Sequence, residues 1–146
     1  MFKSVLVVCV GNICRSPMGE AFLKQLCQEK KMDMSIASAG IGALVGHAAD
    51  KHVIDLMQHR NIDVTEHHAQ QLTESLAMQY ELMLVMEKGH VQAVNQMIPQ
   101  TRGRVHLLGK WNQNEEIPDP YQKSDAHFVA ALSAIERNIQ LWGKYL

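Results

Sequence analysis

The sequence predicts an α/β fold of three layers, in which a four-stranded parallel sheet is flanked by helices on both faces. Short apolar runs rich in β-branched residues alternate with longer segments whose apolar residues recur at helical spacing. This alternation is typical of a parallel sheet, because each return to the same end of the sheet needs a crossover helix. No repeat, linker or low-complexity tract divides the 146 residues, so we expect a single domain over residues 1–146.

Four segments have the composition of strands. The first is the apolar run that leads into Cys9, and the second is a shorter segment that ends at Gly40. The third is a continuous apolar run, and the fourth follows Pro99 and a turn. The predicted strands are 3–9, 35–39, 81–86 and 104–108.

The segments between and after these strands show helical spacing. Ser16 is a favourable N-cap and Pro17 suits the first helical position, so the first helix is expected to begin there. Thr73 and Ser124 are further N-cap candidates, and Pro99 should end the fourth helix. The predicted helices are 17–30, 50–60, 74–79, 88–97 and 125–142.

Composition and charge exclude several classes of protein. With 47% apolar and 20% charged residues, the chain has the composition of a soluble globular domain. A net charge of −1 gives no reason to expect a nucleic-acid partner or a membrane surface. The apolar run near the N-terminus, about five residues long, is too short for a signal-peptide core or a membrane span. We therefore expect a cytoplasmic protein without membrane insertion.

The cysteines and histidines do not suggest a metal site. Three cysteines without metal-type spacing fit a reducing compartment and leave a reactive thiol possible. Eight histidines are scattered, and the one adjacent pair, His67 and His68, has no cysteine or carboxylate pattern around it. We expect no metal, and the sequence calls for no other cofactor.

The loop after the first predicted strand carries the most chemical information. Cys9 ends the strand, a short loop with Gly11 follows, and Arg15 stands at the expected start of a helix. Backbone N–H groups in such a loop and the positive end of the helix dipole form a nest for a tetrahedral oxyanion. Arg15 adds a fork that can bind two phosphate oxygens, and this positive potential favours the nucleophilic thiolate form of Cys9. The predicted phosphate-binding residues are Val10, Gly11, Asn12, Ile13, Cys14, Arg15 and Ser16.

An inert role for Cys9 is the alternative. A cysteine that ends a buried strand is usually a small apolar core residue. Arg15 and Ser16 at this spacing favour catalysis, because inert packing requires neither of them. The segment also lacks the lysine of the nucleotide-binding G-x-x-x-x-G-K-[ST] loop. The loop therefore predicts attack of sulfur on phosphorus.

A second motif, Ile117-Pro118-Asp119-Pro120-Tyr121, lies near the other end of the chain. Taken alone it is best interpreted as a rigid turn, since the two prolines restrict the backbone. Paired with the cysteine loop, Asp119 becomes the candidate acid that protonates the leaving oxygen. Tyr121 is then a candidate wall for a substrate ring.

The two motifs, C-x-x-x-x-x-R-S-P and D-P-Y, together resemble the signature of the low-molecular-weight protein tyrosine phosphatases. The resemblance covers essentially the whole chain, and segments 42–46 (which includes Leu44), 86–88 and 108–111 are most similar to the bacterial capsule and exopolysaccharide branch. It implies a two-step hydrolysis of phosphotyrosine. Cys9 takes the phosphoryl group while Asp119 protonates the tyrosyl oxygen, and Asp119 then activates the water that frees phosphate.

The resemblance also implies supporting roles for residues outside the two motifs. Asn12 would lock the loop through polar contacts with Ser16, Ser38 and His67, and Ser16 would ease departure of the Cys9 thiolate. Leu44 would form an aliphatic wall of the substrate pocket.

The chain departs from the family pattern at Gln70, where many members have arginine, and at Gln122, where the eukaryotic branch has a second tyrosine. Cys14 is either a space-filling residue or a redox partner that forms a disulfide with Cys9 under peroxide.

By the same resemblance the expected partner is a phosphotyrosine protein, in particular an autophosphorylating tyrosine kinase of polysaccharide export. A monomer is the expected state.

Two alternative functions stay open: an arsenate reductase of the same fold, and a non-catalytic phosphotyrosine-binding module. The reductase needs further cysteines downstream, and none follows Cys27. A binding module would normally lack the nucleophile or the acid, and both are present here.

Overall fold

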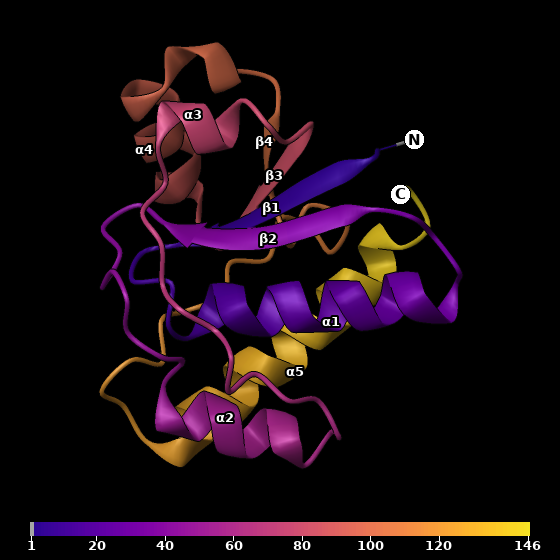
Figure 1. The fold of residues 1–146 in the computed structure, drawn as a ribbon, viewed down its shortest axis with the longest axis vertical. Helices are drawn as coiled ribbons and strands as arrows, with labels where there is room; N and C mark the ends of the chain where they lie inside the picture. Colours follow the sequence, from indigo (N-terminus) through magenta and orange to yellow (C-terminus); the bar gives the residue numbers. More distant parts are fainter. Residues whose placement is uncertain (1) are drawn as a thin grey trace.

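A computed structural model describes residues 2–146, so Met1, at the start of the predicted domain, lies outside the described residues. Four strands form one sheet in the order β2-β1-β3-β4, and every neighbouring pair is parallel (Figure 1). The strands are β1 (Ser4–Cys9), β2 (Ser35–Gly40), β3 (Leu82–Val85) and β4 (Val105–Leu107). The predicted fold class is thereby confirmed.

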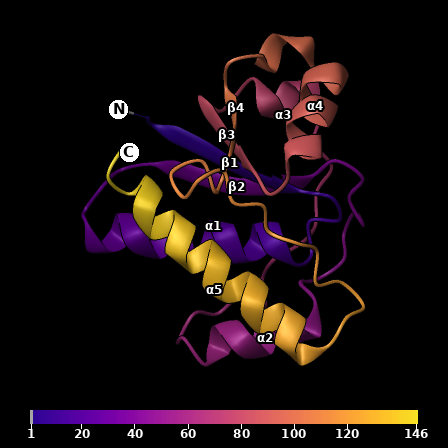
Figure 2. The same ribbon diagram turned by 180° about the vertical axis from the view of Figure 1, so that it is seen from behind.

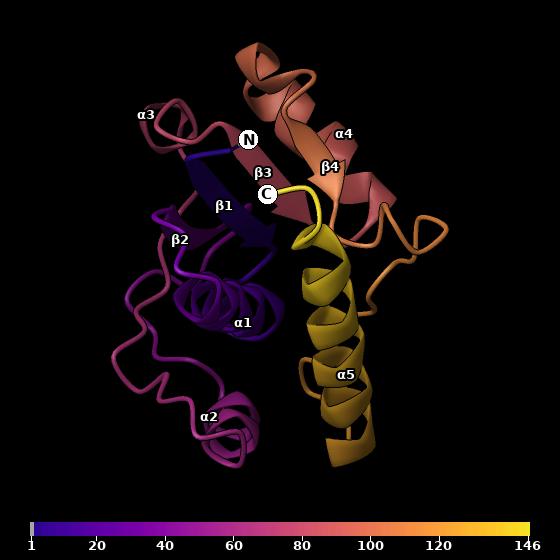
Figure 3. The same cartoon turned by 90° about the vertical axis from the view of Figure 1, so that its right-hand side faces the viewer.

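Helices cover both faces of this sheet. One face carries α1 and α5, with α2 packed against α5 farther from the sheet, and the other face carries α3 and α4 (Figures 2 and 3). The helices are α1 (Arg15–Glu29), α2 (Lys51–Gln58), α3 (Glu74–Ala77), α4 (Lys88–Met97) and α5 (Asp125–Trp142), with a 3₁₀ turn at Pro99–Thr101. Among residues 2–146, none of the helices has the length and apolar character to span a membrane.

The position of β1 in the interior of the sheet explains why the sequence of this strand is continuously apolar. Val5, Val7 and Cys9 point to the core shared with α1, α2 and α5. Leu6 and Val8 point to the second core beneath α3 and α4. A parallel strand covered by helices on both faces has no solvent-facing side, so the polar alternation of a surface strand is absent.

The start of α1 differs from the sequence prediction. The helix begins at Arg15 with Cys14 in the N-cap position, and the Cys14 side chain makes no capping hydrogen bond. Ser16 is therefore not the N-cap, and Pro17 occupies the third helical position instead of the first. The hydroxyl of Ser16 is held instead by Cys9 and Asn12. Pro17 remains compatible with the helix because an N–H in the first turn has no intrahelical acceptor.

The other helix ends are close to their predicted places. Thr73 caps α3 as predicted, its hydroxyl accepting the N–H of Leu76 at 3.2 Å, although α3 ends at Ala77 instead of Gln79. Ser124 is the N-cap residue of α5, but its hydroxyl hydrogen-bonds to Nδ1 of His127 at 2.7 Å.

The topology brings the ends of several strands to one edge of the sheet. The chain leaves β1 toward β2 on one side, while β3 lies on the other side of β1. Such a reversal of strand order opens a crevice at the carboxyl ends of the strands, where α/β proteins bind ligands. Cys9, at the carboxyl end of β1, lies at this crevice.

Candidate active site

A cavity of about 160 Å³ lies at this edge and brings the two sequence motifs together. Cys9, Arg15 and Asp119, the three predicted catalytic residues, all line it, as do both predicted wall residues, Leu44 and Tyr121. The complete lining is Cys9, Val10, Gly11, Ile13, Cys14, Arg15, Gly42, Leu44, Asp119 and Tyr121. Among the predicted phosphate-binding residues, Asn12 and Ser16 are outside this lining and are fully buried beneath the loop.

The Cys9 thiol is buried and lies close to a hydroxyl group. Its Sγ lies 2.9 Å from Oγ of Ser16. The amide Nδ2 of Asn12 donates a hydrogen bond to the same Oγ at 2.7 Å, so this oxygen acts as an acceptor toward Asn12. The hydroxyl proton of Ser16 is then free to point at the sulfur. A donor in this position stabilises a negatively charged sulfur.

Asn12 is the centre of the polar network under the loop. Its Nδ2 also donates to Oγ of Ser38 at 3.0 Å, and its Oδ1 accepts the backbone N–H of Gln70 at 2.9 Å. Its carbonyl accepts a hydrogen bond from Nε2 of His67 at 2.7 Å. Asn12 has φ of 60°, a left-handed conformation that asparagine tolerates better than most residues. The structure therefore brings Asn12, Ser16, Ser38 and His67 together.

Gln70 takes part in this network although it departs from the family pattern. Besides its N–H bond to Asn12, its side-chain Nε2 donates to the carbonyl of Ser38 at 2.9 Å. The glutamine thus ties the segment before α3 to β2, and this segment in turn holds Asn12. Its contact with the loop was not predicted from the sequence.

The guanidinium of Arg15 is buried, with 2% of the side chain exposed, and is held from two directions. Nη1 donates to Oε2 of Glu87 at 2.5 Å and to the carbonyl of Ile117 at 2.8 Å. Nη2 lies 3.7 Å from Oδ2 of Asp119. A buried cation needs such partners because desolvation of an unpaired charge costs several kcal/mol.

The contact of Glu87 with the Arg15 guanidinium was not predicted from the sequence. Glu87 lies two residues after the end of β3 and is the N-cap residue of α4. Its position offered a signal, because residues that follow parallel strands meet at the same edge of a sheet. The sequence could place Glu87 at that edge but could not show that its carboxylate holds Arg15.

Asp119 lies at the mouth of the cavity. Its Oδ1 accepts the N–H of Tyr121 at 3.0 Å, and the side chain is 45% exposed. Ile117, two residues earlier, is fully buried and donates its N–H to the carbonyl of Met86, the residue after β3. This anchor fixes the D-P-Y loop over the carboxyl edge of the sheet.

The segment that follows β2 forms another wall of the cavity, through Gly42 and Leu44. The N–H groups of Gly42 and Leu44 donate to the carbonyls of Val10 and Gly11, so this segment runs along the cysteine loop. Gly40 permits that approach, because a Cβ there would lie 2.4 Å from the carbonyl oxygen of Val10. Leu44 and Val10 are partly exposed at the rim and give it an apolar character.

The second cysteine of the loop has a different environment. Burial, reinforced by the Asp50 carboxylate, raises the pKa of the Cys14 thiol well above its usual value. Cys14 therefore stays a neutral thiol near pH 7. Both Cys9 and Cys14 are free thiols.

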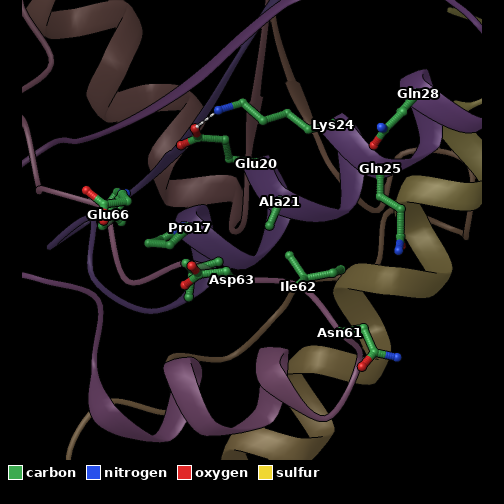
Figure 4. A pocket seen from close by; sticks show the side chains of 12 residues that line it. Pro17, Glu20, Ala21, Lys24, Gln25, Gln28, Asn61, Ile62, Asp63 and Glu66 are labelled. Carbon is green, nitrogen blue, oxygen red and sulfur yellow. Dashed lines mark hydrogen bonds and ion pairs between the residues drawn. The ribbon is translucent and has the colours of Figure 1, made fainter.

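A larger cavity, of about 430 Å³, lies behind the loop between α1 and residues 61–67 (Figure 4). Its lining contains neither a cysteine nor an arginine, and Glu20 and Lys24 form an ion pair along it. Glu20 also accepts a hydrogen bond from Oγ of Ser38 at 2.5 Å. This cavity therefore borders the polar network around Asn12 and lacks the cysteine and arginine that the predicted chemistry requires.

Across residues 2–146, His, Cys, Asp and Glu form no cluster suited to a metal ion.

The fold and the site together define a small α/β phosphatase. Residues 4–146 match the family model described as "Low molecular weight phosphotyrosine protein phosphatase", and the chain belongs to this family. The low molecular weight protein-tyrosine-phosphatase Wzb of Escherichia coli (strain K12) is 42% identical over 146 residues, which are 100% of this chain and 97% of that protein. The predicted family and the predicted enzyme class, a protein-tyrosine phosphatase, are confirmed.

Solved structures give the same result. The structure of Vibrio vulnificus Wzb in complex with benzylphosphonate has a TM-score of 0.94 and 45% identity, and the match covers 100% of both chains. A more distant neighbour is the YwlE arginine phosphatase in a Cys-to-Ser mutant with a phosphorylated active-site serine. It has 26% identity and a TM-score of 0.92 over 98% of this chain and 95% of its own.

Proposed function

We propose that this phosphatase hydrolyses phosphotyrosine in protein substrates through a cysteinyl-phosphate intermediate on Cys9. The observation that carries the proposal is that Cys9, Arg15 and Asp119 line one small cavity, with the Ser16 hydroxyl 2.9 Å from the Cys9 sulfur. A thiol, a buried guanidinium and a carboxyl group are the three groups that displacement at phosphorus requires here.

In the first step the Cys9 thiolate attacks phosphorus and forms an S–P bond while the bond from phosphorus to the phenolic oxygen breaks. The loop amides from Val10 to Ser16 and the Arg15 guanidinium hold the three equatorial oxygens. Asp119 gives its proton to the leaving phenolic oxygen. This protonation matters because a phenoxide of pKa about 10 is a poor leaving group near neutral pH.

In the second step Asp119, now a carboxylate, takes a proton from a water molecule that attacks the phosphocysteine. The S–P bond breaks and Cys9 leaves as a thiolate, which the Ser16 hydroxyl stabilises. Inorganic phosphate is released and Asp119 is protonated again. The YwlE arginine phosphatase, whose Cys-to-Ser mutant carries a phosphorylated active-site serine, supports a phosphoryl-enzyme intermediate in this fold.

The apolar rim supports an aromatic substrate. Leu44 and Tyr121 both line the cavity and are exposed at its surface, so they offer apolar area against which a phenyl ring could pack. The relative from Vibrio vulnificus binds benzylphosphonate, which also places a benzyl group next to a phosphorus centre.

The biological substrate that we propose is an autophosphorylated tyrosine kinase of polysaccharide export. The support is the similarity to proteins named Wzb and the resemblance of segments 42–46, 86–88 and 108–111 to the capsule and exopolysaccharide branch. We further propose that the chain acts in the cytoplasm as a monomer with one catalytic domain, without a cofactor and without nucleic-acid binding.

The testing experiment compares the wild-type protein with Cys9→Ser on p-nitrophenyl phosphate, phosphotyrosine peptide and phosphoarginine peptide. Wild-type protein should release phosphate from phosphotyrosine, and acid-quenched samples should carry a phosphoryl group on the Cys9 peptide by mass spectrometry. Cys9→Ser should fold normally and retain less than about a thousandth of the turnover, because serine is not ionised near neutral pH.

Four outcomes would contradict the proposal. Turnover by Cys9→Ser above that level would remove Cys9 as the nucleophile. Vanadate binding without turnover in the wild type would favour a binding module. Arsenate-dependent consumption of an added thiol would favour the reductase, and preference for phosphoarginine would change the substrate class.

A further inference from the structure

His90 is a nearly buried histidine, 9% exposed, in the first turn of α4, and the mechanism above does not use it. Its ring packs against Glu87. Nδ1 accepts the backbone N–H of Glu87 at 3.2 Å, and Nε2 lies 3.6 Å from Oε2 of the same residue. This Oε2 is also the atom that accepts Nη1 of Arg15 at 2.5 Å. One carboxylate oxygen therefore faces both the proposed phosphate-binding arginine and the histidine.

The hydrogen bonds fix the tautomer of His90. A backbone N–H can only donate, so Nδ1 must carry a lone pair, and the proton of the neutral ring is on Nε2. The Nε2–H group then points toward the Glu87 carboxylate. At 3.6 Å this contact is too long for a hydrogen bond, but the N–H dipole still attracts a carboxylate at that distance.

The surroundings keep the ring neutral near pH 7. Burial, with the nearby Arg15 guanidinium, lowers the pKa of His90, and the opposing carboxylates of Glu87, Asp119 and Glu116 do not reverse this direction. A protonated ring would place a donor at Nδ1 against the Glu87 N–H. The neutral form alone is compatible with both contacts to Glu87.

Glu87 needs such a partner because its side chain is 38% exposed. A half-exposed glutamate loses side-chain entropy when it is held in one rotamer, and water competes for its oxygens. His90 contacts Glu87 at two points, its backbone N–H and its carboxylate. The first contact fixes the ring relative to the backbone of Glu87, and the second attracts Oε2, the oxygen that also accepts Nη1 of Arg15.

We propose that His90 is a positioning residue, which holds the Glu87 carboxylate so that it orients the Arg15 guanidinium toward the phosphoryl group. The proposal rests on the proposed function, since it assigns His90 a role in the same site. Its effect reaches the substrate only through Glu87 and Arg15.

Two isosteric substitutions separate this role from helix capping. In His90→Asn, Oδ1 replaces Nδ1 and keeps the bond to the Glu87 N–H, but the donor toward the carboxylate is lost. In His90→Gln, Nε2 replaces the ring Nε2 and keeps that donor, but the acceptor for the Glu87 N–H is lost. We expect His90→Asn to lower kcat/KM by about 10- to 100-fold and to weaken inhibition by vanadate, as misoriented binding groups do. His90→Gln should retain most of the wild-type kcat/KM and most of the wild-type sensitivity to vanadate.

The same substitutions made in a Glu87→Gln background test whether His90 acts through Glu87. His90→Asn should cause little further loss there, because the carboxylate that it positions is already gone. His106, a partly buried histidine on β4 outside the cavity lining, provides the matched control. His106→Asn and His106→Gln should not differ from one another in kcat/KM or in vanadate inhibition.

The outcomes are distinct. The proposal is overturned if His90→Asn keeps wild-type activity, if His90→Gln loses as much as His90→Asn, or if the loss persists undiminished in the Glu87→Gln background. A fall in melting temperature for His90→Gln with full activity in His90→Asn would leave His90 as a helix cap only. If the wild-type protein fails to hydrolyse p-nitrophenyl phosphate, the proposed function itself fails, whatever the variants do.

Discussion

The Oγ atom of Ser16 lies 2.9 Å from the Sγ atom of Cys9, although Cys9 ends a strand and Ser16 belongs to the helix that follows the loop. This contact exists because α1 begins at Arg15, which places Ser16 in the first turn with its side chain under the loop. A serine two positions earlier, in place of Cys14, would have stood at the N-cap. The start of α1 therefore determines that the hydroxyl serves the sulfur instead of a backbone N–H.

Both partners of this contact are preorganised. Ser16 is fully buried, and Asn12 fixes its oxygen from the other side at 2.7 Å. Groups that are already oriented toward a developing charge need no rearrangement during the reaction, which is the main source of electrostatic catalysis. The buried network under the loop is thus part of the proposed phosphatase mechanism, although it does not touch substrate.

Arg15→Lys tests the fork of the guanidinium. Lysine keeps the charge but cannot bind two phosphate oxygens in a plane, and it cannot reach Glu87 and Ile117 as the Nη1 group does. We expect kcat/KM to fall by about 100-fold or more, in the range found when a transition-state donor is removed, with weaker inhibition by phosphate. Steady-state kinetics with inorganic phosphate as inhibitor measures both. A near-normal lysine variant would show that the loop amides alone hold the phosphoryl group.

Asn12→Ala and Asn12→Gly test the network beneath the loop. Both remove the bonds to Ser16, Ser38 and Gln70, so both should lower turnover strongly. Alanine at φ of 60° adds backbone strain of about 1–2 kcal/mol, so thermal unfolding should occur at a lower temperature for alanine than for glycine.

The control for these variants is Asn61→Gly, at an exposed position with a similar φ of 59°. It should leave kcat/KM unchanged. If Asn12→Gly also kept full activity, the network would be a structural feature without influence on the nucleophile.

The features that were predicted correctly depend on residues close together in the sequence, and those that were missed depend on contacts between distant residues. The strands and the long helices were predicted because apolar periodicity is a local signal, and the cysteine loop because its residues are contiguous. The N-cap prediction for Ser16 was wrong because tertiary hydrogen bonds to Cys9 and Asn12 outweighed a local preference. The contacts of Glu87 with Arg15 join positions 72 residues apart, and no local pattern encodes them.

His106 gives the protein a predicted pH dependence of stability. Burial, with the nearby Lys110, lowers the pKa of His106 below its ordinary value of about 6.5. The unfolded chain therefore binds a proton at a higher pH than the folded chain does, so the free energy of unfolding decreases as pH falls below about 6.5 and through the lowered pKa of the folded state.

Urea unfolding at pH 7.5, 6.5 and 5.5 measures this effect. His106→Gln should reduce the decrease between pH 7.5 and 5.5 relative to the wild type, because glutamine does not titrate. His90 contributes in the same direction, so part of the decrease should remain in the single variant. An identical pH dependence in the wild type and in His106→Gln would contradict the prediction.

Asp119→Asn separates a general acid from a structural turn. Asparagine keeps an oxygen that can accept the N–H of Tyr121, so the D-P-Y loop should retain its conformation. It has no proton to give to the leaving oxygen. Phosphotyrosine, whose leaving phenol has a pKa of about 10, should then be slowed by about 10²- to 10⁴-fold, while strongly activated aryl phosphates should be slowed much less. The turn interpretation predicts a different result, with a similar loss for every leaving group and a lower melting temperature.

The decisive measurement is the rate of phosphocysteine formation for a series of substituted phenyl phosphates, in the wild type and in Asp119→Asn. In the wild type, protonation by Asp119 should make this rate nearly independent of the leaving group. In the variant the rate should fall steeply as the pKa of the phenol rises, because negative charge then develops on the unprotonated oxygen. Since Asp119 also lies 3.7 Å from Arg15, a uniform loss would indicate that the carboxyl group serves mainly to place the guanidinium. A leaving-group dependence unchanged from the wild type would therefore assign the proton to another donor.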